Sequence, residues 1–253
     1  MGHMHGKQVA VIRGGNRTSS QQSKHIGEVV LHVLRDLAIP ATDIYLTPSG
    51  EWLVGGYVKT PTAALATVDV AFIALQDSYG QYRNVQRTLD QLAIPYTGSN
   101  GFGATVAANK LLTKTYATSE QIATPKHILV QRDNVSDVHR LAHTIGELFS
   151  GDVVIKPQYG SGSVDTWVVS PFSPLAPMLN EVLTRHDTIL VEERLLGVEV
   201  SVGVLEGYRG EALYSFPPVE VQLPQDAHYL SADLKQTDQV TLDCPGRRTR
   251  PSH

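Results

Sequence analysis

The chain has 253 residues, 42% of them hydrophobic and 18% charged, which is the composition of an ordinary folded globular protein. A formal net charge of -4 provides no basic field to attract phosphate backbones, so nucleic acid is not an expected partner. The single cysteine, Cys244, excludes an internal disulfide framework, and no apolar run approaches the roughly 20 residues that span a bilayer. We therefore expect a cytoplasmic chain with no membrane segment.

Strand-like and helical segments alternate through the first hundred residues, which is typical of a βαβ layer architecture. A glycine turn follows the first strand, and Thr18, Ser19 and Ser20 are N-cap candidates for the helix behind it. Apolar residues at helical spacing extend this helix to about Leu37. We expect a small doubly wound domain over residues 1–98. Its elements are a strand over 8–12, the helix that ends near 37, a strand over 68–75 and a helix around 84–93.

The stretch VVIKPQYGSGSVDTWVV (residues 153–169) places a glycine-rich loop between two strand-like runs. The loop is not a Walker A motif, because Lys156 precedes the glycines and the residues after them continue as strand rather than helix. A glycine loop on a β-hairpin can present backbone N–H groups to a phosphate, and the lysine adds a positive charge. The alternative is an ordinary hairpin loop with a surface lysine, and the loop alone favours this alternative.

Other charged residues favour the phosphate-binding interpretation. Lys110 lies in NKLLTK, on a helix expected over 108–121, just after a YTGS turn. In ILVEERLLGVEVSV, a strand ends at Glu192 and Glu193, and Glu199 lies on the next strand. Two lysines for phosphates and carboxylates for ribose hydroxyls would form a nucleotide cleft between two β layers.

Together these segments resemble the ATP-grasp superfamily and, within it, the D-alanine:D-alanine ligases. The resemblance covers nearly the whole chain, and its motifs occur in the family's order. It implies an α/β fold in which the small doubly wound N-terminal domain precedes an ATP-grasp fold lacking its last strands and helices. A central ATP-grasp subdomain is expected over 99–187, and a truncated C-terminal subdomain over 188–253. The matching segments are VAVIRGG, FIAL, IPYTGS, NKLLTK, VVIKP with its glycine loop, LVEERLLGVE and DCPG.

The resemblance implies an ATP site when its motifs are carried over residue by residue. Lys110 and Lys156 match the lysines that contact ATP phosphates in the family, and Glu199 matches the residue that holds ribose. Glu193 has a simpler alternative, because a charge at a strand end is often only solvated. The other matched positions are Glu192, Glu193 and Leu195 at the adenine, and Ser161, Gly162 and Ser163 in the flap that covers the phosphates.

The activity implied by the resemblance is that of an ATP-dependent carboxylate-amine ligase, which forms a dipeptide for peptidoglycan precursor synthesis. A carboxylate attacks the γ-phosphate of ATP, and the amine of a second molecule displaces the acyl phosphate that results. The protein contributes mainly positioning and charge neutralisation. The resemblance also suggests a homodimer, and no catalytic residue is assigned to a position of this chain.

Several positions depart from the family at the substrate site. Ser19 stands where the family has a glutamate for the amino group of the first D-alanine, and a hydroxyl loses a charge-assisted bond worth roughly 1.5 to 3 kcal/mol. The tyrosine and lysine of a YEAKY-like loop have no clear match in HYLSADLK (228–235). The substrate is therefore D-alanine or another amino acid. The further departures are Gln76 and Asp77 for the family's HG, Gln81 for an acidic residue, and Gly162 for the second serine of its EGSS flap.

The carboxy-terminal end differs most from the family. Relatives continue past the CPA-like motif with an arginine and the Asp, Glu and Asn that bind Mg²⁺, whereas this sequence stops after PGRRTRPSH. Mg²⁺ requires oxygen ligands around the ATP phosphates, so we expect a truncated chain without a metal site, and a disordered tail from about residue 245. The competing hypothesis is a non-catalytic nucleotide-binding remnant. A third is a small-molecule binding protein that uses only the cleft.

Two remaining features have simpler interpretations than a functional site. His139 and His143 lie four residues apart on an expected helix, a spacing that can bind zinc, but a surface histidine pair is favoured because no third ligand is near in sequence. Cys244 has no neighbouring histidine motif, so a structural or exposed thiol is favoured over a nucleophile.

Overall fold

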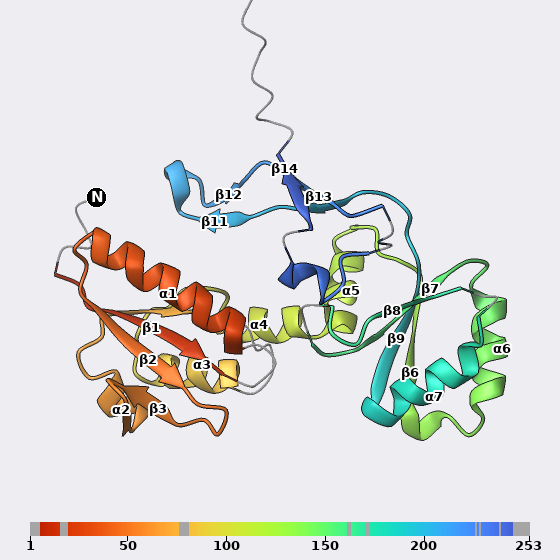
Figure 1. Ribbon diagram of the computed structural model, residues 1–253, viewed down its shortest axis with the longest axis horizontal. Helices are drawn as coiled ribbons and strands as arrows, with labels where there is room; N and C mark the ends of the chain where they lie inside the picture. The colour runs from red at the N-terminus through yellow and green to blue at the C-terminus, as the bar shows by residue number, and fades with distance from the viewer. Residues whose placement is uncertain are drawn as a thin grey trace, which may run out of the picture. The chain divides into compact units, whose positions relative to one another are not determined.

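The computed structural model describes residues 6–15, 20–75, 81–160, 163–170, 173–225, 227, 229–237 and 239–244. The chain forms two compact units. Unit 1 comprises Met1–Gln121 with Tyr159–Ser161, and unit 2 comprises Ile122–Gln158 with Gly162–His253. Figure 1 shows their helices and strands. The division into parts over 1–98, 99–187 and 188–253 stays a prediction, and the N-cap candidates Thr18 and Ser19 and the tail from 245 lie outside the described residues.

Unit 1 is built on a five-stranded sheet in the order β4-β3-β2-β1-β5. The central strand β1 pairs in parallel with β2 and β5, as the βαβ pattern predicts, while β3 and β4 add an antiparallel hairpin at the edge. The elements of unit 1 are β1 (Val9–Gly14), α1 (Ser20–Asp36), β2 (Ala41–Leu46), β3 (Trp52–Val54), β4 (Tyr57–Lys59), α2 (Pro61–Ala64), β5 (Val70–Ile73), α3 (Gln81–Gln91), α4 (Gly101–Ala108) and α5 (Lys110–Ser119).

Helices cover both faces of this sheet, which confirms the doubly wound fold. Successive side chains of a strand point to opposite faces, so Ala10 and Ile12 of β1 lie on one face. They pack there with Leu65 after α2 and Leu89 of α3 in one buried core. Arg13 lies on the other face, against helix α1. Figure 1 shows α1 on the opposite side of the sheet from α2 and α3.

Helix α1 approaches the sheet closely through a glycine. A Cβ built on Gly27 would lie 2.5 Å from Cδ of Arg13, so the residue at this position must be small. The helix has the expected apolar residues, but the apolar stripe that they form is wider than the face that the sheet covers. Val29, Val33 and Leu37 keep about half of their surface exposed.

Unit 2 contains a four-stranded antiparallel sheet in the order β6-β9-β7-β8. Helices α6 and α7 pack on one face, where Ile155 of β7, Val191 of β9 and Leu179 of α7 are fully buried. The elements of unit 2 are β6 (His127–Gln131), α6 (Val138–Leu148), β7 (Val153–Pro157), β8 (Trp167–Val169), α7 (Leu175–Arg185), β9 (Thr188–Glu193), β10 (Glu199–Ser201), β11 (Val204–Glu206), β12 (Leu213–Ser215), β13 (Val219–Gln222) and β14 (Thr241–Asp243).

The last part of unit 2 forms two small sheets and carries little of the core. Strands β10, β13 and β14 make one antiparallel sheet, and β11 pairs with β12 in a hairpin. None of the described residues after Glu192 is buried.

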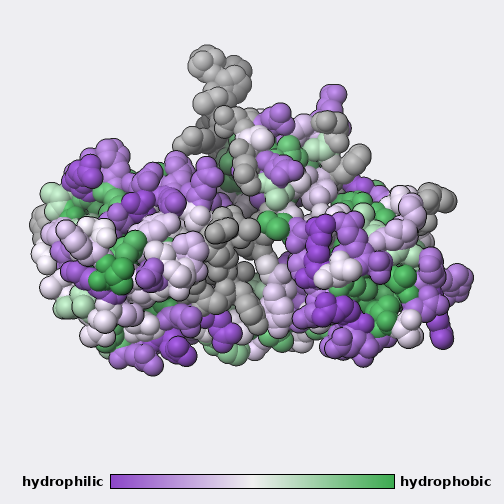
Figure 2. Space-filling view, turned by 60° about the horizontal axis from the view of Figure 1, so that its bottom comes forward, coloured by the Kyte–Doolittle hydropathy of each residue, from purple (hydrophilic) through white to green (hydrophobic). Residues whose placement is uncertain are grey.

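Figure 2 shows hydrophilic and hydrophobic side chains mixed over the visible face of the molecule. Within the described ranges, no helix combines the length and apolar character needed to cross a bilayer.

Candidate nucleotide-binding site

The glycine-rich stretch forms the hairpin that its sequence predicts. Strands β7 and β8 pair antiparallel, with Ile155 opposite Trp167, so strand rather than helix follows the glycines. This is the feature that separates the loop from a Walker A motif. Of the loop residues expected at the phosphates, Ser161 and Gly162 lie outside the described residues, and Ser163 is described. Residues 163–166, which lead back into β8, are called the return segment below.

Lys156 lies on β7 at the entrance of the loop and is paired with a buried carboxylate. Its Nζ atom is 2.7 Å from Oε2 of Glu192, whose side chain is only 3% exposed. The alternation along β7 and β9 places both residues on the face opposite α6 and α7, because their neighbours Ile155 and Val191 fill the core. Glu192, which the family resemblance places near adenine, therefore contacts the lysine of the same site directly.

Glu193, the next residue, has a clear structural partner. Its Oε1 atom accepts a hydrogen bond of 2.7 Å from the backbone N–H of Lys126, and its own N–H donates to the Lys126 carbonyl. Glu193 thus joins the end of β9 to the residue before β6 and is not merely solvated. Leu195 follows with 65% of its surface exposed. The role of both residues at an adenine ring stays a prediction.

Glu199 lies near Lys235, a residue to which the sequence analysis assigned no role. Its Oε1 atom accepts a hydrogen bond of 3.2 Å from the N–H of Leu230. Lys235 donates from Nζ to Oγ of Ser163 in the return segment at 2.8 Å. Burial lowers the pKa of Lys235, and the nearby charge of Glu199 opposes that shift. A partly desolvated ammonium beside a glycine-rich loop favours an anion as its ligand.

The signal for Lys235 in the sequence was weak. It ends the segment HYLSADLK, which lacks the aromatic and acidic pattern of the family's YEAKY-like loop. Lys235 and Ser163 are 72 residues apart in the chain, so only the folded structure shows that they meet.

In unit 1, Lys110 contacts the first part of the loop. It begins α5 directly after the N-cap Asn109, whose Oδ1 accepts from the N–H groups of Leu111 and Leu112. Lys110 donates from Nζ to the carbonyl of Gly160 at 2.9 Å. A lysine in the first turn opposes the helix dipole, so its place there is not explained by helix stability. The convergence of Lys110 and Lys156 on one phosphate chain stays a prediction.

The remaining candidates do not form a metal site. Across the described ranges, no three His, Cys, Asp or Glu side chains gather as metal ligands. No described residue is assigned to Mg²⁺. His143 lies on α6 and pairs with Glu147 of the same helix at 3.6 Å, as a surface histidine does. Four of the departing positions, Ser19, Gln76, Asp77 and Gly162, lie outside the described residues.

Comparisons with known proteins agree with this fold. No protein-family profile matches the chain. The D-alanine–D-alanine ligase of Syntrophotalea carbinolica is 31% identical over 79% of the chain, which covers 60% of that protein. The D-alanine–D-alanine ligase of Polaromonas naphthalenivorans is 28% identical over 93% of the chain, which covers 69% of it. A crystal structure of D-alanine–D-alanine ligase from Bacillus anthracis complexed with ATP matches with a TM-score of 0.69 at 21% sequence identity. The match covers 94% of this chain and 70% of the Bacillus anthracis chain.

The chain therefore spans between 60% and 69% of the length of these two curated relatives. Similarity in sequence runs through both units, and the solved structure shares the arrangement of strands and helices. By sequence and by fold, the chain is a homologue of the D-alanine–D-alanine ligases and has their ATP-grasp architecture.

Proposed function

We propose that the chain binds ATP and acts in the ligation of D-alanine to a second D-alanine, for peptidoglycan precursor synthesis. The homologous proteins are named D-alanine–D-alanine ligases, and one solved relative is titled as a complex with ATP. In the proposed reaction, a carboxylate oxygen attacks the γ-phosphorus of ATP and ADP leaves. The amine of the second molecule then attacks the acyl phosphate, forms the amide bond and releases phosphate and a proton.

The observation that carries this proposal is the contact of Lys235 with Ser163, close to Glu199. A glycine-rich loop, an ammonium group and a carboxylate are the groups that phosphates and ribose hydroxyls need. We assign phosphate contacts to Lys235 and Ser163 and a ribose contact to Glu199. These residues hold and neutralise the nucleotide, which is the main task of a protein in phosphoryl transfer.

The family resemblance also assigns phosphate contacts to Lys156 and to Lys110. Lys156 is oriented by its ion pair with Glu192, and Lys110 by its bond to the Gly160 carbonyl. ATP is a cytoplasmic substrate, so we place the chain in the cytoplasm, and we propose a homodimer on the basis of the family. Mg²⁺ is expected of the family, but no step is assigned to it here.

Nucleotide binding is the first prediction of this proposal. ADP or ATP should raise the unfolding temperature, because a ligand that binds only the folded state stabilises it by RT ln(1 + [L]/Kd). Replacing Lys235→Met should remove a charge-assisted contact and weaken nucleotide binding about tenfold or more, measured by calorimetric titration. Lys59→Met, on the exposed strand β4 of unit 1, is the matched control and should bind nucleotide as the wild type does.

Ligation is tested separately from binding. Phosphate release from ATP in the presence of magnesium should depend on added D-alanine, and the dipeptide should be detected by mass spectrometry. Nucleotide binding without D-alanine-dependent release would support the non-catalytic hypothesis. A wild-type chain that binds neither ADP nor ATP would contradict the proposed function altogether.

A further inference from the structure

The return segment has an unusual backbone that its surroundings must hold in place. Ser163 has φ of 62° and Asp165 has φ of 52°, both in the left-handed region that residues other than glycine rarely adopt. Such conformations persist where several contacts determine them, and they often occur at functional sites. The contacts of Asp165 therefore indicate how this part of the loop is positioned.

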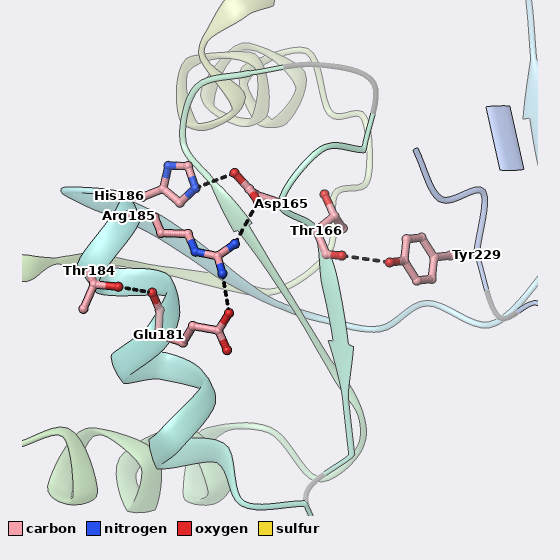
Figure 3. Close-up of polar contacts among 7 residues, drawn as sticks. All are labelled: Asp165, Thr166, Glu181, Thr184, Arg185, His186 and Tyr229. Carbon is pink, nitrogen blue, oxygen red and sulfur yellow. Dashed lines mark hydrogen bonds and ion pairs between the residues drawn. The ribbon is translucent and has the colours of Figure 1, made fainter. Parts of the chain in front are cut away.

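Asp165 is bound to the carboxy-terminal end of helix α7. Its Oδ2 atom lies 2.9 Å from Nε2 of His186, the C-cap residue of that helix, and its Oδ1 atom lies 3.7 Å from Nη1 of Arg185 (Figure 3). The side chains of Asp165 and His186 are only 30% and 24% exposed, so this contact is shielded in part from water. Helix α7 is anchored in turn by buried residues of the unit 2 core.

The neighbours of Asp165 are held from a second direction. The carbonyl of Thr166 accepts a hydrogen bond of 2.8 Å from the hydroxyl of Tyr229, which is drawn in Figure 3. On the other side, Ser163 accepts the bond from Lys235. The return segment is thus held by α7 at its middle and by residues 229–235 at both ends.

The charge of Asp165 explains why its orientation matters. A carboxylate on a loop that covers phosphates would repel them if it turned toward the ligand. Arg185 and His186 attract it toward α7 instead, and Arg185 is itself held by Glu181, whose Oε1 atom lies 2.6 Å from Nη2. The same contact therefore fixes the backbone of the loop and keeps its one acidic side chain directed to the helix.

We propose that Asp165 is a positioning residue of the nucleotide site, and that its contact with Arg185 and His186 fixes the return segment so that Ser163 and Lys235 face the phosphates. The ligand in this inference rests on the proposed function. The contact of Asp165 with Arg185 and His186 does not depend on that function, so the positioning role and the nucleotide-binding role can be contradicted separately.

The first experiment measures the position of the return segment without any nucleotide. The chain has two tryptophans, and Trp167 immediately follows the return segment. In a Trp52→Phe background, quenching of Trp167 fluorescence by acrylamide should increase for Asp165→Asn, which keeps the size of the side chain and tolerates the left-handed backbone. It should increase likewise for the double variant Arg185→Gln/His186→Gln. Glu147→Gln, which changes a carboxylate of α6 that pairs with His143 of the same helix, is the matched control and should leave the quenching unchanged.

The second experiment measures ADP affinity of the same variants by calorimetric titration. Arg185→Gln/His186→Gln should bind ADP about tenfold more weakly, because Asp165 loses both of its partners at the end of α7. Adding Asp165→Asn to this double variant should restore part of the affinity, since the repelling carboxylate is then gone. A role in folding alone would produce no such recovery, and the unfolding temperature measured in parallel should fall little in any variant.

The outcomes separate the two hypotheses. Unchanged quenching in Asp165→Asn and in Arg185→Gln/His186→Gln would overturn the positioning contact, whatever the ADP affinities are. Increased quenching with unchanged ADP affinity would overturn the role at the nucleotide site. If the wild type binds no ADP, the proposed function fails, and the quenching result still decides whether Asp165 positions the loop.

Discussion

At the scale of single residues, the ion pair of Lys156 and Glu192 has two consequences. It orients the ammonium group at the loop entrance, and it compensates a carboxylate that is 3% exposed. A buried charge that loses its partner is costly, whereas replacing both partners by neutral groups is often tolerated. Loss of nucleotide binding in a Lys156 variant therefore has to be separated from loss of stability.

We predict that Lys156→Met lowers the free energy of unfolding by roughly 3 kcal/mol, because Glu192 loses the ammonium that compensates it. The double variant Lys156→Met/Glu192→Gln should recover most of this loss in urea unfolding and should still bind nucleotide poorly. If the double variant is as unstable as the single one, the pair is not the reason for the instability.

Lys235 is expected to behave in the opposite way. Burial lowers its pKa, so the folded chain carries an unfavourable charge at neutral pH, and Lys235→Met should not reduce stability at pH 7. As the pH rises through the lowered folded pKa toward the ordinary lysine value of 10.5, the unfolded chain holds more protons at this site than the folded one. The wild type should therefore gain stability relative to Lys235→Met between neutral pH and pH 10. Urea unfolding of both chains across this pH range measures the difference in their free energies of unfolding. A difference that does not change with pH would contradict burial as the cause of the lowered pKa.

At the scale of elements, helix α1 shows how a glycine decides packing. Arg13 cannot easily move away from Gly27, because Asp43 binds its Nε and Nη2 atoms at 2.8 Å and Glu28 binds Nη1 at 3.0 Å. These carboxylates also raise the pKa of Arg13, against the effect of burial. The arginine therefore forms a fixed surface on which α1 lies.

We predict that Gly27→Ala destabilises unit 1 by about 1 to 2 kcal/mol, since overpacking outweighs the better helix propensity of alanine. Gly146→Ala on α6 is the control, because a Cβ there meets nothing within 4 Å. That variant should gain roughly 0.5 to 1 kcal/mol from propensity alone. Equal effects of the two substitutions, measured by thermal unfolding, would exclude the close approach at Gly27.

The glycine-rich hairpin is the element that sequence reasoning predicted best. Its two strands are runs of apolar and β-branched residues, and the glycines between them leave no helical continuation, so local preference alone suggests a hairpin. Asp165 gave no such signal. A single acidic residue in a loop is usually solvated, and its contact with Arg185 and His186 depends on where α7 ends.

At the scale of the whole molecule, each unit has its own core. The core of unit 1 contains Trp52, whereas Trp167 packs against the core of unit 2. The two tryptophans therefore report on the two units separately. The proposed contacts of Lys235, Ser163 and Glu199 with the nucleotide all belong to unit 2.

We predict that ADP raises the unfolding midpoint of unit 2 more than that of unit 1. Trp52→Phe leaves Trp167 as the reporter of unit 2, and Trp167→Phe leaves Trp52 as the reporter of unit 1. A ligand stabilises the unit that binds it, so the two fluorescence transitions should separate as ADP is added. Transitions that coincide at every ADP concentration would show that the chain unfolds as one cooperative unit.

The sequence alone determined the α/β class, the doubly wound first domain, the strand-loop-strand hairpin and the resemblance of the chain to the ATP-grasp ligases. These follow from local patterns of apolar residues and glycines and from motifs whose order along the chain is itself evidence. Tertiary structure alone decided the partners of the charged residues, namely Lys156 with Glu192, Lys235 with Ser163, and Asp165 with Arg185 and His186. Each of these contacts joins segments that are distant in sequence, and its geometry depends on strand pairing and on where a helix ends, which no local pattern encodes.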